Sequence, residues 1–311
     1  MPSPIDPDSL RQQLSPLRSA AELGADARCY QRYYGLDLPQ RPGIEHRLGC
    51  IDAQDHEVVA QLWCPGQPVA TLVVMHGYYD HMGLYRHVVD WGLQMGFAVL
   101  ACDLPGHGLS SGPRASIDEF AQYQAVLHAL LNEAAELQLP QPVHLLGQST
   151  GAAIVLDYLL GHPQTAALGR GILLAPLVRP HGWRWSRISY ELVRRFVKQI
   201  PRRFSENSGD PDFLEFIRTR DPLQPNILPT AWVGALARWI PRIEAAPRSA
   251  HSPLIVQGEL DMTVDWRHNL SVLERKFTAP DVLYLPGARH HLVNEQQAIR
   301  RQYFEFLSQR V

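Results

Sequence analysis

The sequence has no apolar run long enough to span a bilayer, so it offers no candidate transmembrane helix. Residues 1–8 also lack the basic and apolar regions of a secretory signal, and we therefore expect a cytoplasmic protein. Neither sign of charge dominates: 29 Lys and Arg stand against 31 Asp and Glu, which gives no overall attraction to nucleic acid. With 45% hydrophobic residues among 311, the chain can form one large core, or a core with an inserted subdomain.

Cysteine is scarce, and its spacing excludes the usual cysteine-based sites. Four cysteines occur without paired spacing: Cys29, Cys50, Cys64 and Cys102. Because no export signal precedes them, we expect buried thiols rather than disulfides or metal ligands. A phosphate-binding loop is also absent, because the Gly/Pro-rich stretch 103–112 has neither the lysine nor the spacing of a P-loop. We read that stretch as a rigid turn near an active site.

What is present is a strand that turns into an apolar helix through Gly-x-Ser-x-Gly at residues 147–151. In this motif the serine sits in a strained turn, and a side chain at Gly147 or Gly151 would collide with a neighbouring strand or helix. The apolar or strand-favouring residues before the motif and the apolar run 152–156 after it are typical of a buried strand and a buried helix. The pattern predicts that Ser149 is a nucleophile.

A serine hydroxyl needs a base to accept its proton and an acid to orient that base. Residues 254–261 read as a buried strand that ends in Asp261, and residues 282–290 read as another that ends in a loop with His290. The order Ser149, Asp261, His290 is that of the α/β-hydrolase triad. Asp265 and His291 are alternatives, and we prefer the earlier member of each pair because it lies nearer the end of its strand.

The loop at residues 76–81 follows another buried strand, the apolar run 71–75. A glycine directly after a central strand lets the backbone bend sharply, so His76 and Gly77 can direct the amide of Tyr78 toward Ser149. With the amide of Thr150, this gives two donors for a developing oxyanion. We expect the histidines of the loop to order it rather than to bind metal.

Alternating strand and helix patterns divide the chain. Residues 1–43 are predicted to be an N-terminal extension, and residues 44–175 with 253–311 an α/β core whose mostly parallel sheet is covered on both faces. Ser116 and Glu119 have the spacing of a capping box, which predicts a helix from there to about Leu137. Residues 176–252 lack a buried strand pattern and are predicted to be an inserted helical lid.

Within the lid, residues 179–203 carry seven Arg and one Lys against one Glu. Six apolar residues fall on one face of a predicted helix: Ile188, Leu192, Val193, Phe196, Val197 and Ile200. We favour packing of this face on the core with the arginines solvated. The alternative is peripheral contact with an anionic membrane, for which a basic amphipathic helix near tryptophans is suited.

Five motifs in order resemble the monoacylglycerol lipase and lysophospholipase branch of the α/β-hydrolases. They lie at residues 76–85, 103–110, 147–151, 258–261 and 287–295. The resemblance implies the α/β-hydrolase fold, with an eight-stranded sheet, helices on both faces and an inserted helical lid. It also implies Ser149 as nucleophile, His290 as base, Asp261 as orienting acid and the amides of Tyr78 and Thr150 as oxyanion hole. The bulky Tyr78-Tyr79 pair departs from the small residues common in the lipases.

These observations predict a serine hydrolase that cleaves carboxylic esters, with monoacylglycerol or lysophospholipid as substrate, and without metal or cofactor. A proline iminopeptidase, a carbon–carbon bond hydrolase and an acyltransferase keep the same triad and remain alternatives. A non-enzymatic receptor on the same fold is a further alternative. The serine at the elbow argues against dehalogenases and epoxide hydrolases, which have aspartate there.

Overall fold

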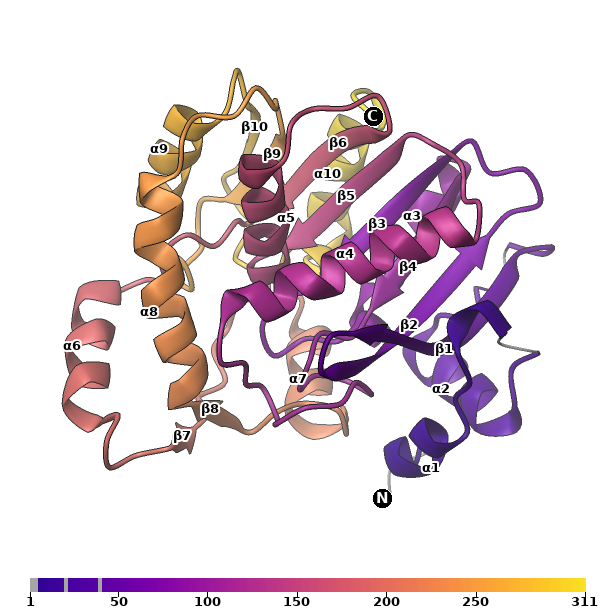
Figure 1. Cartoon of the computed structure of the whole chain (residues 1–311), viewed down its shortest axis with the longest axis horizontal. Helices are drawn as coiled ribbons and strands as arrows, with labels where there is room; N and C mark the ends of the chain where they lie inside the picture. The colour runs from indigo at the N-terminus through magenta and orange to yellow at the C-terminus, as the bar shows by residue number, and fades with distance from the viewer. Residues whose placement is uncertain (1–4, 20–21, 39–40) are drawn as a thin grey trace.

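The computed structural model describes residues 5–19, 22–38 and 41–311, and its centre is an eight-stranded sheet (Figure 1). In spatial order the strands are β1 (Glu45–Ala53), β2 (His56–Cys64), β4 (Phe97–Cys102), β3 (Ala70–Met75), β5 (Val143–Gln148), β6 (Leu168–Leu174), β9 (Leu254–Gly258) and β10 (Asp281–Leu285). The hairpin partners β1 and β2 are antiparallel, β2 is antiparallel to β4, and all other neighbouring pairs are parallel. The predicted α/β-hydrolase fold class is confirmed.

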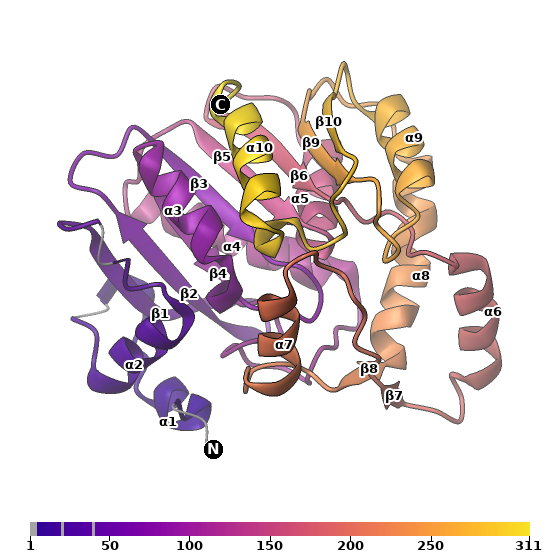
Figure 2. The same cartoon turned by 180° about the vertical axis from the view of Figure 1, so that it is seen from behind.

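Helices cover both faces of the sheet because the strand side chains alternate between two apolar cores. Val73, Leu145 and Leu173 join one core with α4 (Phe120–Glu136), α5 (Thr150–Gly161) and α9 (Trp266–Lys276). Val74 and Leu146 join the other core with α3 (Arg86–Gln94) and α10 (Gln297–Ser308). Figures 1 and 2 show the two layers from opposite sides.

The N-terminal residues pack against the strand β1 side of the core. They include α1 (Pro7–Gln12), the 3₁₀ turn Leu17–Ser19 and α2 (Ala25–Tyr34). Tyr30 and Leu17 are fully buried, so this segment contributes apolar contacts to the core. Residues 1–4, 20–21 and 39–40 of the predicted N-terminal extension lie outside the described residues. Cys102 is buried, but Cys29, Cys50 and Cys64 are only half-buried, so the prediction of four buried thiols was wrong for those three.

The predicted capping box was also wrong by one turn. Helix α4 begins at Phe120, and Glu119 and Gln122 form its capping box. The amide of Ser116 instead donates to the carbonyl of Pro113, and the amide of Ala115 donates to the carbonyl of Gly106 at 2.8 Å. These bonds hold residues 113–116 in the turn of the Gly/Pro-rich stretch and prevent an earlier helix start.

The chain between β6 and β9, which we call the cap, contains three helices and two short strands. The helices are α6 (Trp183–Val193), α7 (Pro211–Thr219) and α8 (Thr230–Ala245). Strands β7 (Gln199–Pro201) and β8 (Ile227–Pro229) pair antiparallel, so the segment is not purely helical. In both ribbon views α6 stands at the outer edge beside α8. Among the described residues no helix has the length and apolar character needed to cross a membrane.

Candidate active site

Ser149 occupies a sharp turn between β5 and α5, at the carboxyl end of the central strand. Its backbone has φ 56° and ψ −110°, a conformation that a serine adopts only when the surroundings enforce it. A Cβ at Gly151 would overlap the carbonyl of Met75, and a Cβ at Gly147 would overlap the carbonyl of Gly151. Both glycines are therefore required by close backbone approach, and they leave the serine side chain at the carboxyl end of the sheet's strands.

His290 and Asp261 reach the same edge from the loops after β10 and β9. The Nε2 atom of His290 lies 2.9 Å from Oγ of Ser149, and its Nδ1 atom lies 2.7 Å from Oδ2 of Asp261. All three side chains are nearly covered, with exposed fractions of 8% for Ser149, 5% for His290 and 2% for Asp261. The structure thus brings the three residues proposed from the sequence into one hydrogen-bonded chain.

Asp261 remains ionised at neutral pH despite its burial. Burial raises the pKa of this carboxyl group, but His290 and the amides of Val264 and Thr263 outweigh it, so the pKa lies below its usual value. Those two amides donate to Oδ1 at 3.1 and 2.8 Å. Because Oδ2 accepts from Nδ1 of His290, the Nε2 atom is left to accept the Ser149 proton.

The two alternative residues have other partners. Asp265 caps the start of α9, where its carboxylate accepts from the amide of His268. Nε2 of His291 lies 3.0 Å from Oδ1 of Asp80. Neither side chain is hydrogen-bonded to Ser149.

The loop after β3 lies against the serine, and its backbone is fixed by side chains around it. His76 accepts from the amide of Leu104 at 2.8 Å and donates through Nδ1 to the carbonyl of Gly77 at 2.7 Å. The hydroxyl of Tyr85 accepts from the amide of Gly77 at 2.9 Å and donates to Asp80. A Cβ built on Gly77 would lie 3.5 Å from Cβ of Ser149. This close approach sets the next residue, Tyr78, beside the serine.

Two backbone amides near the serine are available to bind an oxyanion. Neither the amide of Tyr78 nor that of Thr150 donates a hydrogen bond to any residue that the structure describes. Thr150 is the first residue of α5, and the first amides of a helix have no partner within it. Each therefore carries an unused donor at the edge where an ester carbonyl would be attacked.

The side chains of this loop bind the cap, which the sequence did not indicate. The ring of Tyr78 stacks on Trp232 of α8 with centroids 3.8 Å apart, and the guanidinium of Arg202 lies 4.1 Å from the ring of Tyr79. His81 forms a fully buried ion pair with Asp221 at 2.9 Å. The tryptophans of the cap were the available signal in the sequence for such contacts, but their partners could not be inferred from it.

Both histidines of the loop, His76 and His81, have hydrogen-bond partners within the chain. Within residues 5–19, 22–38 and 41–311, no group of three or more His, Cys, Asp or Glu side chains is arranged to hold a metal ion.

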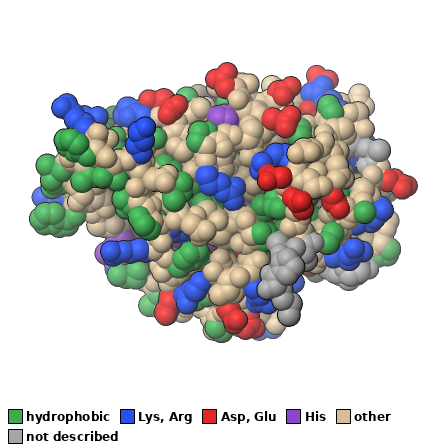
Figure 3. Space-filling view, turned by 90° about the horizontal axis from the view of Figure 1, so that it is seen from below, with side chains coloured by type: hydrophobic (Ala, Val, Ile, Leu, Met, Phe, Trp, Pro, Cys, Tyr) green, Lys and Arg blue, Asp and Glu red, His purple; other side chains and the backbone are tan. Residues whose placement is uncertain are grey.

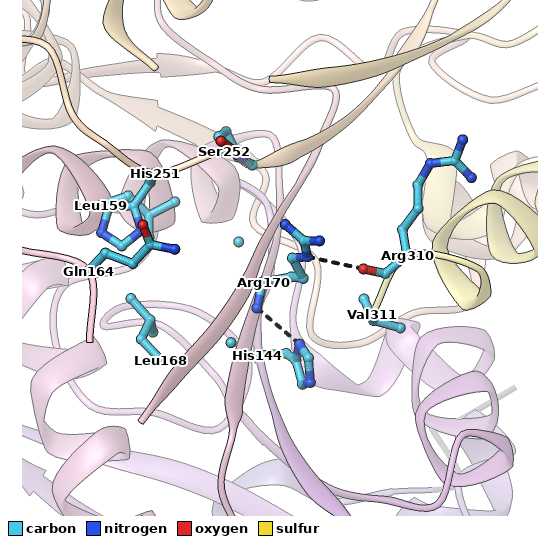
Figure 4. A pocket seen from close by; sticks show the side chains of 12 residues that line it. His144, Leu159, Gln164, Leu168, Arg170, His251, Ser252, Arg310 and Val311 are labelled. Atoms are coloured by element: carbon cyan, nitrogen blue, oxygen red, sulfur yellow. Dashed lines mark hydrogen bonds between the residues drawn. The ribbon is translucent and has the colours of Figure 1, made fainter. Parts of the chain in front are cut away.

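A hollow of about 430 Å³ lies at the opposite end of the sheet's strands, near the amino ends of β5, β6 and β9 (Figure 4). There the amide of Arg170 donates to Nδ1 of His144, and the side chain of Arg170 donates to the carbonyl of Arg310. None of Ser149, Asp261 and His290 lines this hollow, so it is separate from the hydrogen-bonded chain.

A sequence model of the family described as serine aminopeptidase S33 matches residues 66–297. Among curated proteins, a monoacylglycerol lipase of Mycolicibacterium smegmatis is 26% identical over 252 residues, covering 77% of this chain and 88% of the relative. A monoglyceride lipase of Rattus norvegicus is 24% identical over 270 residues, covering 83% and 87%.

Among solved structures, a soluble variant of monoglyceride lipase from Saccharomyces cerevisiae in complex with a substrate analog superposes with a TM-score of 0.73. The identity is 17%, and the alignment covers 87% of this chain and 95% of that one. At this identity the likeness establishes the fold alone.

Proposed function

The chain belongs to the serine aminopeptidase S33 family of α/β-hydrolases. We propose that it cleaves esters of monoacyl lipids through an acyl-enzyme on Ser149. The family and the curated relatives identify it as a carboxylic ester hydrolase. The hydrogen-bonded chain from Ser149 through His290 to Asp261 is the observation that carries the proposed mechanism.

The first half of the reaction forms the acyl-enzyme. Oγ of Ser149 attacks the ester carbonyl while Nε2 of His290 accepts its proton, and the amides of Tyr78 and Thr150 bind the oxyanion that develops. The resulting imidazolium is stabilised by the ionised Asp261 and then protonates the leaving alcohol. Water repeats the sequence on the acyl-enzyme and releases a fatty acid.

The monoacyl lipid substrate class is supported by the relatives, two of which are named monoacylglycerol lipase and monoglyceride lipase. An amide substrate is the second candidate, because the matching family is described as serine aminopeptidase. Both substrates use the same nucleophile and base, so only rates on matched substrates separate them.

The test is hydrolysis by the purified protein of p-nitrophenyl esters of rising chain length, monoacylglycerol, lysophosphatidylcholine and a prolyl-naphthylamide. We expect long-chain monoacyl lipids to be cleaved best and Ser149→Ala to reduce turnover by about 10⁴-fold or more while the melting temperature is kept. Ester hydrolysis retained by Ser149→Ala would contradict the mechanism. Cleavage restricted to the prolyl amide would keep the mechanism and replace the substrate class.

A further inference from the structure

The outward face of α6 and of the chain that follows it is apolar and exposed, contrary to the packing that we favoured from the sequence. Trp185 is 76% exposed, Leu192 71% and Phe196 86%. Ile188, Val193 and Ile200 are exposed as well. Six of the ten exposed large hydrophobic side chains of the described residues thus lie between positions 185 and 200. We call these six residues the α6 face.

The reason for the difference is that α6 packs on the body with its opposite side. Trp183 is buried in the core, and the hydroxyl of Tyr190 lies close to Gly234 of α8. Residues 185, 188 and 192 follow one another at helical spacing on the other side. The helix also ends at Val193, so the predicted apolar stripe through Ile200 continues through a turn at residues 194–196 into strand β7 rather than along one long helix.

Cations surround the α6 face without acidic partners. Within the described chain, six cations between 184 and 203 form no ion pair: Arg184, Arg187, Arg195, Lys198, Arg202 and Arg203. Arg202 is held inside the molecule by Gln224 and Tyr79, which leaves the other five for the α6 face. The one acid of this stretch, Glu191, already binds Arg194 at 2.8 Å. The space-filling view shows hydrophobic side chains interspersed with Lys and Arg at the end of the molecule where α6 lies (Figure 3).

The α6 face lies next to the loop that carries Asp261. The amide of His181, just before α6, donates to the carbonyl of Thr263, and the amide of Asp265 donates to the carbonyl of Arg179. In that loop Met262 is 71% exposed and Leu260 is 53% exposed, on either side of the buried Asp261. A hollow of about 360 Å³ between the two segments is lined by Arg184, Trp185 and Asp265, among others.

We propose that the α6 face docks on an anionic lipid bilayer, with its aromatic and aliphatic side chains in the interface and its unpaired cations on the lipid phosphates. Transfer of exposed Trp and Phe side chains from water into the headgroup region of a bilayer is favourable. Each Lys or Arg near an anionic surface strengthens binding by about fivefold. Docking in this orientation sets the Asp261 loop at the membrane. The inference goes beyond the proposed function and does not depend on catalysis.

The experiment is flotation of the full chain carrying Ser149→Ala with vesicles of phosphatidylcholine alone or with 30 mol % phosphatidylglycerol, at about 0.1 M salt. The inactive background makes the result independent of whether the protein is a lipase. We expect at least about tenfold tighter binding to the anionic vesicles, and loss of that preference at about 0.5 M NaCl, where charges are screened within a few ångströms.

Variants then locate the contact. We expect Trp185→Ser with Phe196→Ser to weaken binding about tenfold or more, and Arg184→Gln with Arg187→Gln and Arg195→Gln on the order of 100-fold. Val69→Ser, which removes a side chain 64% exposed just before β3, and Arg301→Gln on α10 are matched controls expected to change binding less than twofold. All of these side chains are at the surface, so unchanged melting temperatures verify folding.

Three results would overturn the proposal. One is binding to neither vesicle, and another is unchanged binding by both α6 variants. The third is a dimer in sizing experiments that Trp185→Ser dissociates while no vesicle is bound, which would assign the α6 face to a second copy of the chain.

Discussion

The end of the sheet that carries the candidate active site, called the catalytic end below, and the α6 face differ in how their side chains are partnered. At the sheet edge Ser149, His290 and Asp261 are buried, and each is hydrogen-bonded to the next. On α6, Trp185 and Leu192 are exposed to water and lie among unpaired arginines. Buried polar groups must be paired within the chain, whereas a surface with unpaired apolar and basic groups is suited to an external partner. The first region is therefore complete within the chain, and the second is not.

The loop after β3 joins the catalytic end to the cap. Tyr78, Tyr79 and His81 each contact one cap residue, namely Trp232, Arg202 and Asp221. The amide of Tyr78 is one of the proposed oxyanion donors, so the cap supports the catalytic end through this loop. The comparison can be tested by changing paired residues at the core, at the junction and on α6.

The largest effect is expected at the catalytic end, for Asp261→Asn. Without the carboxylate, His290 is no longer held in the tautomer that accepts the Ser149 proton, and we expect kcat to fall about 10⁴-fold. Steady-state hydrolysis of the best ester of the panel measures it, with the melting temperature as a check of folding.

Asp265→Asn is the matched control, because this second carboxylate lies four residues later and caps α9. We expect it to keep activity within a few-fold and to lose about 1 kcal/mol or less of stability. If the two variants behaved in the reverse way, Asp265 would be the orienting acid.

Sequence patterns were sufficient to propose the residues of the candidate catalytic end because each is signalled by a short motif. A Cβ at Gly147 would meet Gly151 of the same strand–turn–helix unit, whereas a Cβ at Gly151 would meet Met75 at the end of the neighbouring strand β3. The carboxyl ends of parallel strands bring Asp261 and His290 to the same end of the sheet. These contacts are long-range, but the motif and the strand ends that signal them each lie in a window of a few residues.

The cap was less predictable because its contacts are long-range. The stripe from Ile188 to Ile200 fits an amphipathic helix, yet the pattern does not say whether the body covers it or whether Trp183 and Tyr190 form the inner side instead. The start of the helix at Phe120 was predicted wrongly for a similar reason. Ser116 with Glu119 has the same spacing as Glu119 with Gln122, so the sequence does not tell which pair forms the capping box. Only the backbone bond between Ala115 and Gly106 distinguishes them.

An intermediate effect is expected at the junction, where His81 and Asp221 form a buried ion pair. Burial lowers the pKa of His81, but Asp221 outweighs it, so the folded pKa lies above the ordinary value near 6.5. The pKa of Asp221 is lowered, because His81 outweighs its burial. The stability from the raised His81 pKa is fully present below about pH 6.5 and is lost as the pH rises through the folded pKa. The stability from the lowered Asp221 pKa is present above about pH 4 and is lost as the pH falls through the folded pKa.

We therefore expect Asp221→Asn to cost about 3–5 kcal/mol in urea unfolding at pH 5.5, and less at pH 9. The partly exposed Glu244, which pairs with both His268 and Arg179, is the control, and Glu244→Gln should cost about 1 kcal/mol or less at pH 5.5. A cost for Asp221→Asn that rises from pH 5.5 to pH 9 would contradict the assigned shifts.

The smallest effect is expected on the outer side of α6, and it is measured against the inner side of the same helix. Trp183 is 8% exposed, so Trp183→Ala should cost about 3 kcal/mol of unfolding free energy. Trp185→Ala, two residues later and 76% exposed, should change it by less than about 0.5 kcal/mol. Urea unfolding of both variants, in protein without lipid, gives the comparison. Equal losses would mean that Trp185 is covered in solution, and the contrast between a self-contained catalytic end and an unpartnered α6 face would fail. A loss confined to Trp183 would mean that α6 is held by one side only, which leaves the other free for a bilayer.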